Sequence, residues 1–548
     1  MRVRWYKKTV IYSVDVDTFR DGNGDGVGDF IGLRQGLSYI SGLGIGCLWL
    51  LPFYPSPGRD NGYDITDYLN VHPVLGDLGD FVLFMDEARN LGIRVIIDLV
   101  VNHTSDQHPW FQAARSGDPR YRDYYVWRTD DPGNTDDQAV FPGEQHGVWQ
   151  YDEEAKAYYF HRFYAYQPDL NTSNPAVRSE IKKIMGFWLT LGVSGFRMDA
   201  APFVIAQKGP QAEKQPHEEF ELLDEFRDFV SWKANEAVLL AEANVHPDQM
   251  LQYFGPNDSR MHLVLNFFLN PHLFLALAEE SAEPISRALN QLPQLPENGQ
   301  WAYFVRNHDE LDLSRLTQVE RERCFRKFAS KPEMRLYGRG IRRRLAPMLG
   351  GDVDRQMLAY SLTFSLPGTP ILWYGEELGM GDDLAQEGRC SVRTPMQWAN
   401  EYNAGFSSAP LDKLRRPVIG KGKFNYHKIN VQELRRQPES LLNRLERLIR
   451  TRKEYPEFAV GIYRILETSA PEIVFAHACQ DGDGSAVIAA HNFSEKASTV
   501  QIKLWTDQFD HFSYLLADRQ NEKIKDGAIT LDLPRYGFCW VRLKTRLG

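Results

Sequence analysis

Arg197 and Asp199 stand two residues apart at the end of an apolar run, in the stretch from Gly195 to Asp199. In a β-strand, side chains two apart share one face, so the guanidinium would lie beside the carboxylate. Such a neighbour favours the ionised acid and is expected to hold the pKa of Asp199 down, as a nucleophilic carboxylate requires. Ion pairs of this kind are commonly structural, so a catalytic role depends on which other groups share the site.

Three more apolar runs end in polar residues, namely Asn102 with His103, then Glu242, and then the stretch from Asn307 to Asp309. Neighbouring strands lie about 4.8 Å apart, so Asp199 and Glu242 could approach to about 5 to 5.5 Å, the separation found in retaining glycosidases. Glu242 follows an apolar run, where loss of hydration would raise the pKa of Glu242 and make it a proton donor. Asp309 and the histidines would hold sugar hydroxyl groups.

The elements that position these residues are eight short apolar runs. They alternate with segments of helical periodicity such as 81–91 and 179–191. This alternation predicts a (β/α)₈ TIM barrel, in which catalytic residues lie at the C-terminal ends of the strands. The runs are Val10 to Val16, Cys47 to Leu51, Ile93 to Val101, Val193 to Met198, Ala237 to Ala241, Leu263 to Phe268, Ala302 to Val305, and Pro370 to Tyr374.

Two segments break the alternation. Residues 104–169 are aromatic, Pro-rich and Asp-rich without a good crossover helix, which predicts an inserted loop domain after the third strand. Residues 457–548 carry alternating strand patterns and a Gly/Asp-rich turn, which predict a C-terminal antiparallel β-sandwich domain. The catalytic barrel would then comprise residues 1–103 and 170–456.

Composition excludes several classes of protein. A formal net charge of -10 disfavours nucleic-acid binding, and the cluster from Arg342 to Arg344 is interpreted as a solvated helix face. The five cysteines are scattered without metal-ligand spacing, and no apolar run reaches membrane-spanning length. The first residues also lack the pattern of a signal peptide. We therefore expect a cytoplasmic protein without membrane contact or an organic cofactor; homo-oligomerisation is left open.

Four segments together resemble the signature segments of the α-amylase superfamily, glycoside hydrolase family 13. They are 98–103, 195–199, 240–244 and 304–309, in the usual order. The resemblance implies that Asp199 is the nucleophile, Glu242 the acid/base and Asp309 the third carboxylate. It also implies a glucose site, lined by Asp64, His103, Arg197, His308 and Arg393.

Aromatic side chains near the predicted strand ends offer stacking faces for sugars. Tyr63, next to Asp64, is the strongest candidate, and Phe163 in the loop domain is a second one. Any single ring in such a position is more commonly part of the core.

The stretch from Asp21 to Asp29 offers oxygens at alternate positions, with glycines that let the backbone curl around a cation. It resembles the start of an EF-hand loop but lacks the final glutamate, since Gly32 stands there. By resemblance to calcium loops of the superfamily, we expect a structural Ca²⁺, with Mg²⁺ as the alternative. The ligands would be Asp21, Asn23, Asp25, Val27 and Asp29. Asn102 and Asp169 are candidates for a second calcium site.

Longer segments, 51–57, 102–111, 340–347 and 392–398, resemble the trehalose synthases. That resemblance implies intramolecular glucosyl transfer between maltose and trehalose through a covalent glucosyl-enzyme. The chain departs from the pattern at Phe203, at Cys390 and around 212–217, so an α-glucosidase or transglucosidase acting on short α-glucosides, including malto-oligosaccharides, is the alternative. A non-catalytic sugar-binding barrel is a remote third reading.

Overall fold

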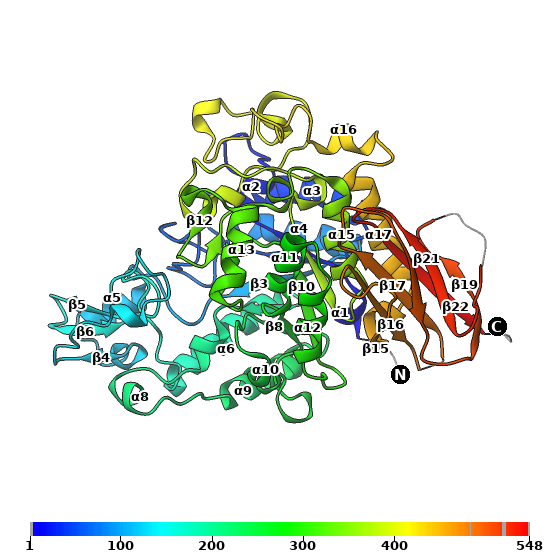
Figure 1. The fold of residues 1–548 in the computed structure, drawn as a ribbon. Coiled ribbons are helices and arrows are strands. Elements are labelled where there is room, and N and C mark those ends of the chain that lie inside the picture. Colours follow the sequence, from blue (N-terminus) through cyan, green and yellow to red (C-terminus); the bar gives the residue numbers. More distant parts are fainter. Residues whose placement is uncertain (1–3, 483, 518–521, 546–548) are drawn as a thin grey trace.

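The computed structural model describes residues 4–482, 484–517 and 522–545. Its centre is a closed barrel of eight parallel strands in the order β1-β14-β10-β9-β8-β7-β3-β2 (Figure 1). Each strand falls on one of the eight apolar runs, so the predicted barrel is confirmed. The strands are β1 (Ile11–Val14), β2 (Cys47–Leu50), β3 (Arg94–Leu99), β7 (Gly195–Met198), β8 (Val238–Ala241), β9 (Leu263–Leu265), β10 (Gln300–Phe304) and β14 (Thr369–Trp373).

Helices cover the outside of the barrel. In α6, Asn174 caps the N-terminus, Pro175 occupies the first turn, and Ile181, Met185 and Trp188 bury one face against the strands. The predicted helical segments lie in α4 and α6. The longer helices are α3 (Phe30–Gly42), α4 (Leu78–Asn90), α6 (Pro175–Thr190), α9 (Glu221–Lys233), α10 (Pro247–Phe254), α11 (Leu269–Glu279), α12 (Glu283–Gln291), α13 (Gln318–Phe328), α15 (Val353–Ser365) and α17 (Leu441–Glu454).

A small domain projects from the barrel between β3 and β7, at the left of Figure 1. It contains α5 (Pro109–Arg115) and a sheet of β4 (Trp127–Arg128), β6 (Ala157–Phe160) and β5 (Trp149–Asp152). It joins the barrel through a bridge between His103 and Asp169. The inserted domain is thus present where the sequence predicts it.

The C-terminal part consists of two antiparallel sheets with a shared apolar core. The larger sheet contains β15 (Ile462–Ile465), β16 (Val474–Gln480), β17 (Ala486–Asn492), β22 (Phe538–Thr545), β19 (Phe509–Tyr514) and β20 (Glu522–Lys523). The smaller one pairs β18 (Ser498–Lys503) with β21 (Ala528–Leu533), and Val500 and Leu531 pack with Ile488 and Val541 of the larger sheet. This arrangement is the predicted sandwich. The exact borders of the three domains stay a prediction.

The chain between β10 and β14 forms a three-stranded sheet that bears on the site. β11 (Leu311–Asp312) pairs with β13 (Gly340–Ile341), which also pairs with β12 (Arg335–Leu336). Gly340 is the first residue of β13, and Glu310 directly precedes β11. A Cβ on Gly340 would lie 2.5 Å from Cγ of Glu310, so only glycine lets β13 come this close to β11.

The interpretation of Arg342 to Arg344 as a solvated helix face is wrong. These residues form an extended segment before α14 (Leu345–Met348), and Arg344 is fully buried. Its guanidinium donates to the carbonyl of Tyr374 at 2.9 Å and pairs with Glu376 at 3.1 Å. A buried carboxylate, which the local sequence does not reveal, therefore draws this arginine inward.

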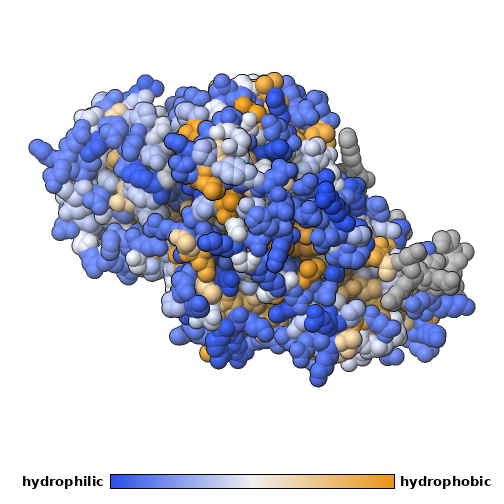
Figure 2. All heavy atoms as spheres, turned by 90° about the horizontal axis from the view of Figure 1, so that it is seen from above, coloured by the Kyte–Doolittle hydropathy of each residue, from blue (hydrophilic) through white to orange (hydrophobic). Residues whose placement is uncertain are grey.

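No helix in the described ranges is long and apolar enough to cross a membrane. The face of the molecule in Figure 2 is mostly hydrophilic, with hydrophobic atoms in small separate groups. This distribution agrees with the charged composition of the chain.

Candidate active site

Asp199 and Glu242 follow β7 and β8, and Arg197 lies between them. β7 and β8 pair in register, with Met198 opposite Ala241, so the two carboxylates leave the barrel at the same level. Arg197 Nη1 is 2.5 Å from Asp199 Oδ1, and its Nη2 is 2.8 Å from Glu242 Oε2. One guanidinium thus contacts both carboxylates that the sequence predicts to be catalytic.

Arg197 lowers the pKa of Asp199, as expected, but the expected net shift below the usual range is wrong. Burial raises the pKa of Asp199 to about 6, against the opposing effect of Arg197. Asp98 adds to the rise, because its negative charge disfavours a second charge on the nearby Asp199. Asp98 binds the same guanidinium, that of Arg197, at 2.9 Å.

The predicted rise at Glu242 is confirmed. Burial raises the pKa of Glu242 to about 7, although Arg197 opposes the shift. The amide of Ala200 also donates to Glu242 Oε2 at 2.9 Å. Glu242 is therefore the weaker acid of the two, which is the order that a proton donor and a nucleophile require.

Asp309 lies in the loop after β10, beside two arginines and a histidine. Its carboxylate is 3.1 Å from Arg393 Nη2, 3.3 Å from Arg389 Nη1 and 3.2 Å from His308 Nε2. Burial alone would raise the pKa of Asp309, but Arg389, His308 and Arg393 hold it well below its usual range. Asp309 is thus ionised throughout the neutral range and can accept hydrogen bonds from a sugar.

Tyr63 and the two predicted histidines complete this side of the site. The Tyr63 ring stacks on His308 with an interplanar angle of 8°, and its hydroxyl lies 2.9 Å from His308 Nε2. His103 Nε2 is 3.2 Å from the carbonyl of Tyr63, and burial lowers the pKa of His103 to about 4. Phe163 contacts His103 edge to face. Both histidines are neutral at pH 7, because burial also lowers the pKa of His308.

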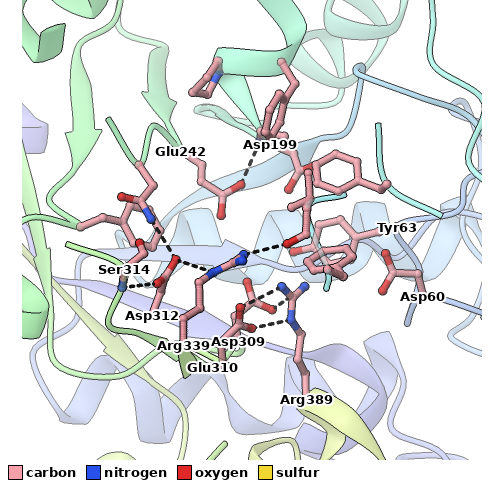
Figure 3. A pocket seen from close by; sticks show the side chains of 18 of the residues that line it. Asp60, Tyr63, Asp199, Glu242, Asp309, Glu310, Asp312, Ser314, Arg339 and Arg389 are labelled. Carbon is pink, nitrogen blue, oxygen red and sulfur yellow. Dashed lines mark hydrogen bonds and ion pairs between the residues drawn. The ribbon is translucent and has the colours of Figure 1, made fainter. Parts of the chain in front are cut away.

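Tyr63, His103, Phe163, Asp199, Glu242 and Asp309 line a cavity of about 490 Å³, large enough for a disaccharide (Figure 3). Arg197 and His308, also predicted to line the site, are not among its lining residues. Asp60 and Tyr63 lie on the opposite side of the cavity from Asp312 and Ser314. The lining residues are Asp60, Tyr63, His103, Val140, Phe141, Phe163, Asp199, Ala200, Pro202, Phe203, Glu242, Asn244, Phe267, Asp309, Glu310, Asp312, Ser314, Arg315, Arg339 and Arg389.

Asp64, predicted to line the site, faces away from the cavity. Its carboxylate is fully buried and accepts from Ser56 Oγ at 2.8 Å and from the amides of Asp60 and Arg59 at 3.1 Å. It holds its own loop together. Arg393 also contributes indirectly, because it does not line the cavity and contacts Asp309 and the carbonyl of His308 instead.

Asp60 and Arg389 are cavity residues that the sequence pattern did not indicate. Asn61 and Gly62 have positive φ angles of 50° and 97°, so the chain reverses and brings Asp60 beside Tyr63. The Asn-Gly pair is a turn signal that could have pointed to Asp60. Burial raises the pKa of Asp60 to about 6, and Gln167 donates to its Oδ2 at 2.8 Å.

The two departures noted at Phe203 and Cys390 both lie at or near the cavity. Phe203 lines it and contacts Phe163 edge to face. The Cys390 thiol lies 3.3 Å from Asn61 Oδ1, beside the turn that positions Asp60.

A lysine replaces the second predicted calcium site. Lys208 Nζ donates to Asn102 Oδ1 at 2.9 Å and to the carbonyls of Asn102 at 3.1 Å and Leu170 at 2.9 Å. It also pairs with the fully buried Asp169 at 3.1 Å. The ammonium thus sits among the oxygens expected to bind a metal, and no cation is needed there.

The loop from Asp21 to Asp29 has the local fold that its ligand spacing requires. Asp21, Asn23 and Asp25 each accept from the amide two residues further on, at 2.9 to 3.1 Å. In the described ranges, none of the three loop carboxylates pairs with a basic residue, and no three acidic, His or Cys side chains converge into a metal cluster. A cation here would therefore also need the Asn23 amide and the Val27 carbonyl, so the metal site stays a prediction.

Comparisons with known proteins agree with this geometry. A family model described as "Alpha amylase, catalytic domain" matches residues 12–332 and 342–461. The chain is 40% identical to "Trehalose synthase/amylase TreS" of Mycolicibacterium smegmatis, over 98% of this chain and 93% of that relative. It is 29% identical to "Oligo-1,6-glucosidase" of Parageobacillus thermoglucosidasius, over 93% of both.

Solved structures show the same fold. The trehalulose synthase MutB from Pseudomonas mesoacidophila MX-45 superposes with a TM-score of 0.77 at 26% identity, covering 99% of this chain and all of that one. The Bacillus licheniformis trehalose-6-phosphate hydrolase superposes with a TM-score of 0.76 at 26% identity and similar coverage.

A closed parallel barrel with a carboxylate pair around one buried arginine defines an enzyme of the barrel glycoside hydrolase class. The chain belongs to the α-amylase family, glycoside hydrolase family 13.

The pKa values of Asp199, about 6, and Glu242, about 7, predict a bell-shaped pH dependence of kcat/KM. Lowering the pH protonates the nucleophile, and raising it deprotonates the donor. The two limbs report the interacting pair, since both acids contact Arg197. Glu242→Gln assayed with α-glucosyl fluoride, whose leaving group needs no proton, should keep the acid limb and lose the alkaline one. An alkaline limb unchanged in this variant would contradict the assignment.

Lys208→Gln should destabilise the fold by about 3 to 5 kcal/mol, because the buried Asp169 carboxylate loses its cation. Urea unfolding followed by circular dichroism measures the effect. The control Lys503→Gln removes an exposed pair with Glu467 and should cost less than about 1 kcal/mol. Equal midpoints for the two variants would refute a structural role for Lys208.

Proposed function

We propose that the enzyme interconverts maltose and trehalose by transferring a glucosyl group within its cavity. The observation that carries this is the buried pair Asp199 and Glu242, joined by Arg197 in a cavity of disaccharide size. The relatives at 40% identity, whose names describe trehalose synthases, support the choice of disaccharides.

In the first step, the Asp199 carboxylate attacks the anomeric carbon while Glu242 donates its proton to the departing glycosidic oxygen. The carbon–oxygen bond breaks, and a covalent glucosyl ester forms on Asp199. In the second step, Glu242 takes the proton of an acceptor hydroxyl, whose oxygen attacks the anomeric carbon and releases Asp199. Asp309 and the neutral His103 and His308 would bind ring hydroxyls and hold them more tightly at the transition state.

The charges that line the cavity favour neutral sugars. Six carboxylates line it against three arginines; they are Asp60, Asp199, Glu242, Asp309, Glu310 and Asp312, with Arg315, Arg339 and Arg389. A sugar phosphate would add further negative charge among them, which favours neutral α-glucosides as substrates.

The loop domain closes over the cavity, which supports transfer over hydrolysis. Phe141 stacks on Tyr337 with ring centroids 4.7 Å apart, and Arg339 Nη2 donates to the carbonyl of Val140 at 2.9 Å. A cover fixed in this way would keep water from the glucosyl ester while the released glucose reorients.

The alternative is an α-glucosidase or transglucosidase acting on short α-glucosides. The observation that favours it is Phe203 in the cavity wall, since its ring offers no hydroxyl with which to hold a released sugar. A non-catalytic sugar-binding barrel is disfavoured, because Asp199, Glu242 and Asp309 all line the cavity.

A product time course with maltose, and another with trehalose, distinguishes these functions. We expect each disaccharide to be converted into the other with little free glucose, because the cover formed by the loop domain would keep water from the glucosyl ester. Asp199→Asn should lose turnover by a factor of about 10⁴ or more, which shows that the purified activity belongs to this site. Rapid release of glucose, or growth of longer oligosaccharides, would replace the proposal with its alternative.

We also propose that the loop from Asp21 to Asp29 binds a structural Ca²⁺, or Mg²⁺ in its place. Its three carboxylates and the carbonyl of Val27 are the hard oxygen donors that these cations prefer. Asp29 also caps α3 by accepting from the amide of Gly32 at 2.6 Å, so a cation here would stabilise the start of that helix.

Removal of the cation with a chelator should lower the thermal unfolding midpoint, and added Ca²⁺ should restore it. Ca²⁺ at a hundredfold excess over its Kd would stabilise the fold by about 2.7 kcal/mol. In Asp25→Asn the midpoint should no longer respond to Ca²⁺. If the wild-type midpoint does not change with either treatment, the loop holds no cation under these conditions and the proposal fails.

The location is proposed to be cytoplasmic. Cys47, Cys324 and Cys479 are buried thiols outside any disulfide, as expected for a reducing compartment.

A further inference from the structure

The outer end of the cavity is built from residues that the glucosyl-transfer steps do not use. Asn244 follows β8, while Asp312, Ser314 and Arg315 come from β11 and the turn after it. Arg339 reaches them from the segment before β13. Asp312 and Ser314 lie on the far side of the cavity from Asp60 and Tyr63 (Figure 3).

Asp312 is the centre of this group. Its Oδ1 accepts from the amide of Ser314 at 2.7 Å, and its Oδ2 accepts from Asn244 Nδ2 at 3.0 Å. Arg339 Nε is 3.7 Å away and balances the charge. A carboxylate has about four acceptor positions, so these two hydrogen bonds leave one free position on each oxygen. Asp312 lines the cavity, so its carboxylate has acceptor capacity to spare for a second sugar.

Arg315 fixes this arrangement by binding Asn244. Its Nε donates to Asn244 Oδ1 at 2.7 Å, and its Nη2 donates to the carbonyl of the same residue. With its oxygen engaged in this way, Asn244 must present its amide nitrogen to Asp312. Arg315 is thus a positioning residue, which acts on the sugar through Asn244 and Asp312.

We propose that Asp312 determines which hydroxyl of the released glucose re-attacks, by accepting hydrogen bonds from the 2- and 3-hydroxyls of that glucose. This inference rests on the proposed interconversion of maltose and trehalose. The two transfer steps described above assign no residue to the acceptor glucose, and Asp312 would be the residue that binds it.

The symmetry of a carboxylate suits this task. A two-fold rotation of a glucose ring about the axis through the middle of its C2–C3 bond exchanges O2 with O3 and carbon C1 with C4. The α-hydroxyl at C1 is axial whereas O4 is equatorial, so the turned sugar must also tilt to bring O1 to the position that O4 held. A carboxylate has the same two-fold symmetry, so its two hydrogen bonds are equivalent before and after the turn. The glucose can therefore present O4, which gives maltose, or O1, which gives trehalose, against the same protein group.

Three further lining residues place no directional demand on the sugar. Pro202, Phe203 and Phe267 line the cavity with apolar surface, against which either face of a glucose ring can lie. Asp312 is then the group that gives the turning sugar two defined positions.

The test uses α-glucosyl fluoride to form the glucosyl-enzyme in the presence of free glucose. The ratio of disaccharide to hydrolysis product measures how well the acceptor is held, whatever the rate at which the ester forms. Asp312→Asn keeps the shape but replaces one acceptor oxygen with a donor. We expect the ratio to fall by about tenfold or more and the proportion of trehalose to maltose to change.

The control is Asp532→Asn, which alters an exposed carboxylate bonded to Thr499 in the C-terminal sheet and should leave both ratios unchanged. Arg315→Lys keeps the charge but loses the paired contact with Asn244, and should change both ratios in the same direction as Asp312→Asn. It also provides the measurement if the Asp312 variant does not fold. Wild-type ratios in the folded Asp312 or Arg315 variant would overturn the inference.

Failure of the proposed function gives a different result. A wild-type enzyme that only releases glucose from maltose would refute interconversion, yet maltose would still place a glucose at the outer end. In that case Asp312→Asn must raise KM for maltose by about tenfold relative to α-glucosyl fluoride. An unchanged ratio of the two KM values would then overturn the role of Asp312 as well.

Discussion

The buried guanidinium of Arg197 is the interaction on which the site depends. A cation this deep in a barrel is stable only if anions meet it, and Asp98, Asp199 and Glu242 all do so within 2.9 Å. Because burial opposes ionisation and the three acids share a single positive charge, all three pKa values lie above their usual range. The ion pairs with Arg197 thus stabilise charged groups in the barrel centre. They also leave Glu242 with a pKa of about 7, so that it can hold a proton near neutral pH.

The barrel strands supply the reacting groups, whereas the inserted domain and the chain between β10 and β14 supply the cover of the cavity. Asp199 and Glu242 are placed by strand register, which tolerates little variation. The cover over the cavity comes from Phe141 of the inserted domain and from the sheet of β11, β13 and β12, whose close pairing depends on Gly340. Chemistry and selectivity are therefore carried by different parts of the chain, and loops can change the acceptor while the strand ends stay the same.

The strands, both added domains and the carboxylates at the strand ends could all be predicted, because apolar runs and the residues that end them are local patterns. Asp60 was missed in favour of Asp64, since the choice depends on the turn at Asn61 and Gly62. The direction of the pKa shift at Asp199 was wrong, because the local sequence shows neither how deeply Asp199 is buried nor that Asp98, about a hundred residues away in the chain, lies next to Arg197 in space. Burial of Arg344 by Glu376 was missed for the same reason.

Lys208 has a consequence for how the inserted domain is attached to the barrel. A metal site at the junction of the inserted domain and the barrel would have to bind a divalent ion from solution. In this chain the ammonium group of Lys208 occupies that position instead. A charge attached to the backbone cannot be diluted, exchanged or removed by a competing chelator. The attachment of the domain that covers the cavity is therefore set by the sequence, and metal supply does not enter into it.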